Sequence, residues 1–225
     1  MKKLLLSSLL LVTAINAEEV ARTVSEDTNK TITESKVEKP TSTPLTTKES
    51  GFYLGAGTTV LNFGGSVEVD DGYRTTSIDK DTEEKPFILK LGYLSESENR
   101  VELYYKKGSI DTTNNLNISR EFDISLFGIN YQWGISSLSS DKVLPYIRLG
   151  MGFGSGTANY TTHDFVAVEV DLALGVYYKV TPKFDLSAGV YRRAIVLADD
   201  NTNGTTDEII STALNGIEFG ATYHF

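Results

Sequence analysis

The chain of 225 residues contains no cysteine, and it has only five prolines, two methionines, two histidines and one tryptophan. Without cysteine there is no disulfide framework, no thiolate nucleophile or metal ligand, and no acceptor for the lipid of a lipoprotein. No stretch after residue 17 approaches the roughly 18–20 consecutive apolar residues of a transmembrane helix. These absences exclude a disulfide-stapled domain, a lipoprotein and a helical membrane protein.

Positive charge is also scarce. The chain has 21 basic and 30 acidic residues, a net charge of −9. Loss of an N-terminal segment containing Lys2 and Lys3 would leave 19 basic against 30 acidic residues, a net charge of −11. Such an acidic chain is not expected to bind nucleic acid, nor to act as a polybasic binder of membrane surfaces.

The first 50 residues divide into two segments. Residues 1–17 resemble a secretory signal peptide, because a basic start precedes a short apolar run and a small-residue cleavage site ends at Ala17. A buried N-terminal helix is the alternative. Residues 18–50 are rich in Thr, Ser, Glu and Lys and contain no aromatic residue. This composition predicts a disordered tether rather than a small folded module, and the barrel topology predicted below would place this tether in the periplasm.

From Gly51 onward the chain alternates apolar and polar residues with a period of two. In residues 166–176, for example, the even positions are Val or Leu and the odd positions are Ala, Glu, Asp or Gly. This is the pattern of a strand with one apolar face and one polar or small-residue face. It predicts eight strands, at about 51–60, 86–94, 100–107, 121–133, 144–154, 165–180, 184–196 and 213–225.

The connections between these strands fall into two classes. The short or moderate ones are Ser95–Asn99, about 134–143, and 181–183. The longer, more polar ones are about 61–85, 108–120, 155–164 and 197–212. Short turns at one end and long loops at the other are typical of outer-membrane barrels, in which the long loops face outward. The first long loop is expected to be partly strand, because Val67 and Val69 alternate with acidic residues.

We therefore predict an all-β fold: an eight-stranded antiparallel up-and-down transmembrane β-barrel over residues 51–225, with the N- and C-termini periplasmic. A soluble sandwich or lipocalin-like barrel is the alternative. Such a fold would carry its charges on the exposed face. Here the polar face consists mainly of Gly and Ala with a few charges, as a narrow lumen requires.

The C-terminal residues resemble the assembly signal of bacterial outer-membrane barrels. Glu218, Gly220, Tyr223 and Phe225 occupy its polar, glycine, aromatic and final phenylalanine positions. Residues 51–57, Gly-Phe-Tyr-Leu-Gly-Ala-Gly, resemble the first strand of small barrels of the OmpA-transmembrane and opacity-protein type. The resemblance implies an outer-membrane location and recognition by the barrel-assembly machinery.

The fourth predicted strand is irregular. Its apolar residues begin on one parity (Phe122, Ile124, Leu126) and then change to the other (Phe127, Ile129, Tyr131). Two explanations are open: a β-bulge that shifts the register, or a strand that extends above the membrane.

The strand residues that are predicted to face the lumen include charges of both signs. A register centred on Pro182 places Asp171 opposite Arg193 and Lys179 opposite Asp185, and a turn centred on Ser97 places Leu91 opposite Leu103. These charges indicate either a structural salt-bridge core that plugs the lumen or a gated pore or proton path, and we favour the plugged core. The predicted lumen charge network is Lys90, Glu102, Arg148, Glu169, Asp171, Arg193 and Glu218.

No catalytic site is predicted. Lipid A deacylases and palmitoyl transferases need a positioned base beside a nucleophile or an activated water. His163 precedes Asp164, but Phe165 and Val166 follow where a serine would be required, so His163 is interpreted as a loop residue. His224 is interpreted as a strand residue that faces the lumen.

One predicted loop carries oxygen ligands in the order of a calcium loop. Asp199, Asn201, Asn203 and Asp207 take the ligand positions, and Gly204 takes the sixth. The twelfth position is Ile210 instead of Glu, and Asn, Gly and Asp also occur in ordinary hairpin loops. Calcium is therefore a weak candidate, and no other cofactor is expected.

The sequence leaves three functions open. The favoured one is a structural barrel that supports membrane integrity and displays acidic loops for adhesion or another surface interaction. The alternatives are a narrow OmpW-like channel for small or apolar solutes, and a lipid A-modifying enzyme. The expected partners are outer-membrane lipids and lipopolysaccharide, the barrel-assembly machinery and an extracellular ligand of the loops, and the protein is expected to be a monomer.

Overall fold

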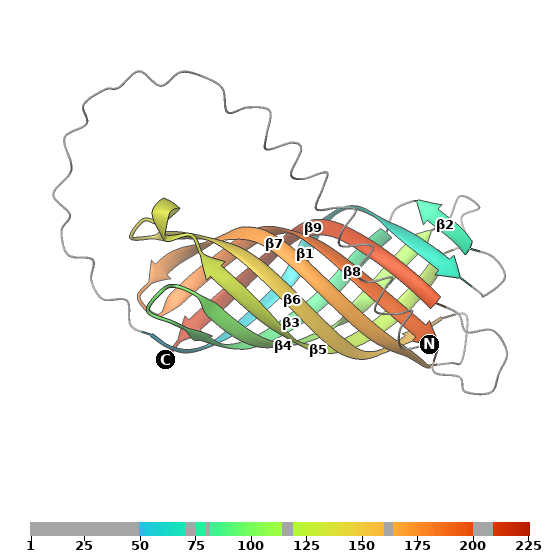
Figure 1. The fold of residues 1–225 in the computed structure, drawn as a ribbon, viewed down its shortest axis with the longest axis horizontal. Helices are drawn as coiled ribbons and strands as arrows, with labels where there is room; N and C mark the ends of the chain where they lie inside the picture. The colour runs from blue at the N-terminus through green and yellow to red at the C-terminus, as the bar shows by residue number, and fades with distance from the viewer. Residues whose placement is uncertain (1–49, 71–74, 80–81, 114–118, 160–163, 200–208) are drawn as a thin grey trace, which may run out of the picture. The chain divides into compact units, whose positions relative to one another are not determined.

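The computed structural model describes residues 50–70, 75–79, 82–113, 119–159, 164–199 and 209–225. Within these ranges the chain forms nine β-strands and one short 3-10 helix (Figure 1). No helix in these ranges is long and apolar enough to cross a membrane. The elements are β1 (Gly51–Asp70), β2 (Thr75–Asp79), β3 (Thr82–Leu94), β4 (Arg100–Thr113), β5 (Ser119–Gly134), η1 (Ser136–Leu138), β6 (Val143–Ala158), β7 (Asp164–Thr181), β8 (Phe184–Asp199) and β9 (Ile209–His224).

The sheet closes on itself. Every neighbouring pair is antiparallel, and β1 pairs with β9 along nearly its whole length. β2 and β3 share the other edge of β1: Ser66 lies opposite Asp79, and Thr58 lies opposite Phe87, in one continuous register. β2 therefore lies in line with β3, and the two together form one of the eight strands of the barrel wall. The predicted eight-stranded up-and-down barrel is confirmed.

The strands are longer than predicted at the end of the barrel that lies opposite the start of β1. We call the end where β1 starts and β9 stops the terminal end, and the opposite end the loop end. β1 continues to Asp70, which confirms that the wall extends through Val67. Most of the predicted loop 108–120 is strand, because β4 runs to Thr113 and β5 begins at Ser119. The longer strands pair the backbone groups of these residues, which an irregular loop would leave without strand partners. The barrel wall therefore extends well beyond the predicted bounds at this end.

Both predicted registers are confirmed. Leu91 lies opposite Leu103, and Asp171 lies opposite Arg193. The β7–β8 pairing also places Lys179 opposite Asp185, next to a bulge that precedes the turn. Tight turns thus set the register of the strands that they connect.

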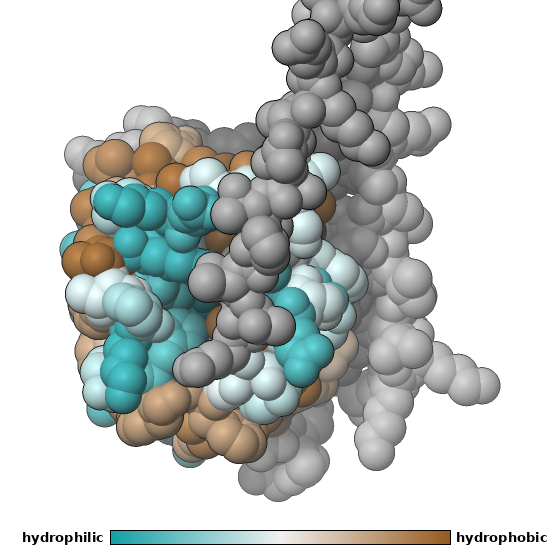
Figure 2. Space-filling model, turned by 90° about the vertical axis from the view of Figure 1, so that its left-hand side faces the viewer, coloured by the Kyte–Doolittle hydropathy of each residue, from teal (hydrophilic) through white to brown (hydrophobic). Residues whose placement is uncertain are grey.

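The outer wall near the terminal end is apolar. Leu91, Leu103, Leu149 and Leu174 are each about half exposed on this wall. Figure 2 looks onto the terminal end and shows hydrophilic residues in its centre and hydrophobic residues along much of its rim. A soluble barrel would have the opposite arrangement, with its apolar residues inside. An apolar outer belt is the surface that a barrel presents to lipid.

Toward the loop end, the inward face of the wall becomes apolar and the outward face becomes polar. Along β5, Phe127 is 69 % exposed, whereas Leu126 is fully buried inside the barrel. β5 pairs with β4 and β6 without a register shift, so the first of the two explanations, a bulge, is wrong. The change of parity instead marks where the interior changes from charged to apolar. The other predicted explanation, a strand that extends beyond the apolar belt, agrees with this geometry.

Candidate functional site

The candidate site is the interior of the barrel, where alternate residues of the long strands point inward. β4 supplies Arg100, Glu102, Tyr104 and Lys106 in succession, and all four are buried. The same alternation brings residues that are far apart in the sequence into three layers along the barrel. From the loop end to the terminal end these are an apolar layer, an ionic layer and an aromatic layer.

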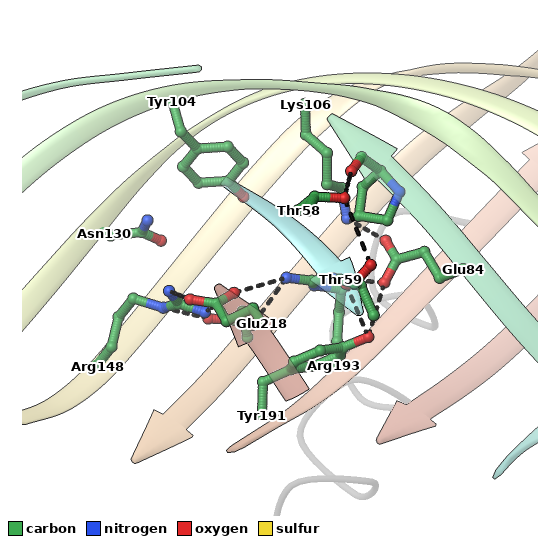
Figure 3. Close-up of polar contacts among 12 residues, drawn as sticks. Thr58, Thr59, Glu84, Tyr104, Lys106, Asn130, Arg148, Tyr191, Arg193 and Glu218 are labelled. Atoms are coloured by element: carbon green, nitrogen blue, oxygen red, sulfur yellow. Dashed lines mark hydrogen bonds and ion pairs between the residues drawn. The ribbon is translucent and has the colours of Figure 1, made fainter. Parts of the chain in front are cut away.

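The loop-end part of the ionic layer is centred on two cations. The Lys106 ammonium donates to Glu84 at 2.9 Å and also binds Glu169. The Arg193 guanidinium binds Glu84 and lies 3.5 Å from Glu169 and 3.3 Å from Asp171. Figure 3 shows Lys106 and Arg193 converging on Glu84 from different strands. Each carboxylate is therefore shared between two cations, which offsets the cost of removing it from water.

The remainder of the ionic layer is centred on Arg148. Its Nε donates to Asp171 at 2.7 Å, and its Nη2 donates to Glu218 at 2.9 Å while Nη1 binds the other oxygen of Glu218. Lys90 lies 4.0 Å from Glu218. Such bidentate pairs are the strongest and most directional charged hydrogen bonds. The layer is thus one connected network rather than a set of isolated pairs.

Neutral donors complete the hydrogen bonding of the carboxylates. Tyr53 donates to Glu102 at 2.9 Å, and the Asn130 amide donates to the other oxygen of Glu102 at 3.2 Å. Tyr104 donates to Glu169 at 2.9 Å. The carboxylates therefore receive hydrogen bonds from both charged and neutral groups, as burial requires.

The aromatic layer at the terminal end surrounds Arg100. Its Nη2 donates to Asp185 at 2.7 Å, and its guanidinium carbon lies 3.6 Å from the centre of the Tyr177 ring. The His224 Nε2 lies 2.8 Å from the same Asp185 carboxylate. Arg100 Nε and Nη1 have no hydrogen-bond partner among the described residues. The stacking on Tyr177 and Tyr53 replaces part of that missing hydrogen bonding.

The apolar layer fills the interior at the loop end. Its buried residues include Phe122, Ile124, Leu126, Ile195 and Leu197, which come from two strands on different sides of the barrel. Below it, the ionic layer leaves a cavity of about 10 Å³ between Lys90, Asp171 and Glu218 and their neighbours. That volume corresponds to about one water molecule.

All seven residues of the predicted charge network lie buried in this interior. The buried charged residues that the sequence interpretation missed include Glu84, Lys106 and Arg100. Glu84 was assigned to a loop, and Arg100 stands at the first position of its strand. Lys106 precedes Lys107, and only the parity of Glu102 and Tyr104 could have shown which lysine points inward. Asp185, which the predicted register places opposite Lys179, binds Arg100 and His224.

The remaining predicted sites are placed as follows. Gly220, Tyr223 and Phe225 lie at the end of the chain, where the rings of Tyr223 and Phe225 are exposed and form an edge-to-face contact at 5.7 Å. The calcium-loop residues Asn201, Asn203 and Asp207, the side chain of Asp199, and His163 lie outside the described residues. In the described part of the chain, no group of three His, Asp or Glu side chains is arranged to hold a metal ion.

A closed antiparallel barrel with an apolar outer belt and a charged interior defines the class of transmembrane β-barrel proteins. The chain belongs to the outer membrane protein beta-barrel domain family, which it matches over residues 38–225. It is therefore a protein of the bacterial outer membrane. No match to a curated protein was found.

The chain is similar to several solved outer-membrane proteins at low sequence identity. Neisserial surface protein A is 18 % identical, with a TM-score of 0.47 over 79 % of this chain and 99 % of that protein. OprG of Pseudomonas aeruginosa is 13 % identical, with a TM-score of 0.48 over 78 % of this chain and 97 % of that protein. Ail, the attachment invasion locus protein of Yersinia pestis, is 14 % identical, with a TM-score of 0.35 over 76 % and 98 %.

Proposed function

We propose that this protein is a structural outer-membrane barrel whose lumen is plugged and whose loop end serves surface interaction. One observation supports the plugged lumen: two different layers occupy the interior in series. The ionic layer joins Arg148, Arg193 and Lys106 to carboxylates on strands that are not their neighbours, and the apolar layer lies between it and the loop end. An ion or polar solute would have to break the first layer and then leave water to cross the second.

The outer surface of the loop end supports the interaction role. Glu68, Glu83, Glu121, Asp123 and Asp164 are exposed there on the outer wall, beyond the apolar belt. A rigid wall that continues past the belt would hold the loops away from the lipid surface. We propose that the loops bind an extracellular ligand and that the embedded wall contacts outer-membrane lipids and lipopolysaccharide. The proposal includes recognition of the C-terminal strand by the barrel-assembly machinery, and a monomeric state.

The proposed role is not enzymatic and requires no cofactor. His224 is engaged with the Asp185 carboxylate inside the barrel, where it is also near the ring of Tyr53. Calcium binding by Asp199, Asn201, Asn203 and Asp207 is a separate proposal, which isothermal titration of the purified protein with calcium would test.

Conductance of the purified protein in a planar bilayer tests the plugged lumen. We expect no discrete current steps, because the two proposed layers would interrupt a water path through the lumen. Reproducible steps from the unmodified protein would overturn the proposal and support the narrow channel. Mass spectrometry of lipid A from cells with and without the protein tests the third function, since a change in acylation would show an enzyme.

A further inference from the structure

The cavity inside the ionic layer is surrounded by side chains from seven strands, β3 to β9. Its volume is about 10 Å³, and its lining includes Ile88, Lys90, Asn130, Asp171 and Arg193. A volume of this size admits one occupant as large as a water molecule, provided that two or more polar groups bind it. The hydrogen bonding of the lining side chains therefore decides whether the cavity is a binding site.

Lys90 is a buried cation in this lining that has no direct hydrogen bond. Its side chain is 7 % exposed, and its ammonium lies 4.0 Å from Glu218 Oε1, which is too far for a hydrogen bond. Lys90 makes no other ion pair and no hydrogen bond in the part of the chain that the structure describes. Since a buried ammonium without an acceptor is costly, Lys90 needs an acceptor on the cavity side.

Two other groups of the lining have unused hydrogen-bonding capacity. Among the described residues, Asp171 Oδ2 accepts no hydrogen bond and Arg193 Nε donates none. Arg193 Nη2 lies 3.3 Å from Asp171 Oδ2, and its Nε lies 3.5 Å from Glu169, so these contacts are ion pairs without hydrogen-bond geometry. Buried polar groups in native proteins are nearly always hydrogen-bonded. The cavity thus faces two donors that need an acceptor and one acceptor that needs a donor.

We propose that the ionic layer binds one water molecule in this cavity. The water accepts hydrogen bonds from Lys90 and from Arg193 Nε, and it donates one to Asp171 Oδ2. A bound metal cation could not accept a hydrogen bond from Lys90, and a halide ion could not donate one to Asp171, whereas water does both.

This water connects the two parts of the ionic layer. It links Lys90, which lies on the Arg148 side, to Arg193 on the side of Glu84 (Figure 3). A bridging water is nearly as favourable in enthalpy as a direct hydrogen bond. One enclosed water is not a continuous path, so the site does not depend on whether the lumen conducts.

The test is a crystal structure of the full-length protein at a resolution that shows ordered water. We expect one peak of density within about 3.2 Å of Lys90 Nζ, Asp171 Oδ2 and Arg193 Nε. Crystals grown in rubidium chloride or in sodium bromide should show no anomalous signal at that peak. A cavity without density in the unmodified protein would overturn the proposal. An anomalous signal would also overturn it, because the occupant would then be a cation or an anion.

Two variants and their matched controls test the partners of the water. Lys90→Met removes one of its donors, and Ile88→Phe enlarges a side chain of the lining, so both should abolish the peak. Lys107→Met, at an exposed lysine of the outer wall, and Ile88→Val should both keep it. The mobility difference between boiled and unboiled samples identifies the variants that fold. A peak that persists in folded Lys90→Met or folded Ile88→Phe would overturn the site.

Discussion

Arg148 and Glu218 form a two-point ion pair across the interior, although their strands are separated by β7 and β8 around the barrel. Both side chains are almost completely buried. A pair of this kind fixes the distance between two parts of the wall. Glu218 also lies 3.8 Å from Arg193 and 4.0 Å from Lys90, so the pair connects these two cations to Arg148.

Removal of one partner of this pair should therefore lower the free energy of unfolding much more than removal of both. Glu218→Gln leaves Arg148 without its bidentate acceptor, and we expect the free energy of unfolding to fall by about 3 kcal/mol. The double variant Arg148→Met with Glu218→Met should stay within about 1 kcal/mol of the unmodified protein. Urea unfolding in lipid vesicles, followed by the fluorescence of Trp133, measures both. Equal losses in the single and double variants would contradict a compensated ion pair.

Two adjacent lysines provide a second comparison. Lys106 is fully buried between Glu84 and Glu169, and Lys107 is exposed on the outer wall. Lys106→Met leaves two buried carboxylates with one fewer cation, and we expect a loss of about 3–5 kcal/mol in the free energy of unfolding. Lys107→Met should cause little change. A comparison of unfolding midpoints gives the answer, and similar midpoints for the two variants would show that the inward parity of Lys106 is wrong.

The reversed polarity of β5 gives a third prediction. Leu126→Ala opens a cavity in the apolar layer, and we expect the free energy of unfolding to fall by about 2–5 kcal/mol. Phe127→Ala removes a larger side chain, but from the outer wall, where lipid fills the space. It should therefore be the milder change in vesicles. If Phe127→Ala were the more destabilising of the two, the boundary between the apolar and the charged part of the interior would not lie at Leu126.

β5, the fourth of the strands predicted from the sequence, also shows how much of the fold the sequence could predict. Alternation located the strands, and the short turn at Pro182 gave the β7–β8 register, because both depend only on neighbours along the chain. The apolar layer could not be found in the same way. It is made where inward residues of several strands meet, and β5 alone offers only a change of parity. Glu84 was missed for a related reason, since its strand continues into a segment that looked like a loop.

The last prediction follows from the order of the ionic layer and the apolar layer along the lumen. Asp171→Ala with Arg193→Ala should remove the centre of the ionic layer, yet the apolar layer would still exclude water. We therefore expect no current steps from this double variant in a planar bilayer. Adding Phe122→Ala and Ile195→Ala, which thin the apolar layer, should produce steps if the variant folds, as judged by the mobility difference between boiled and unboiled samples. Steps from the double variant alone would show that the ionic layer is the only barrier, and silence from the folded fourfold variant would place the barrier in another part of the barrel.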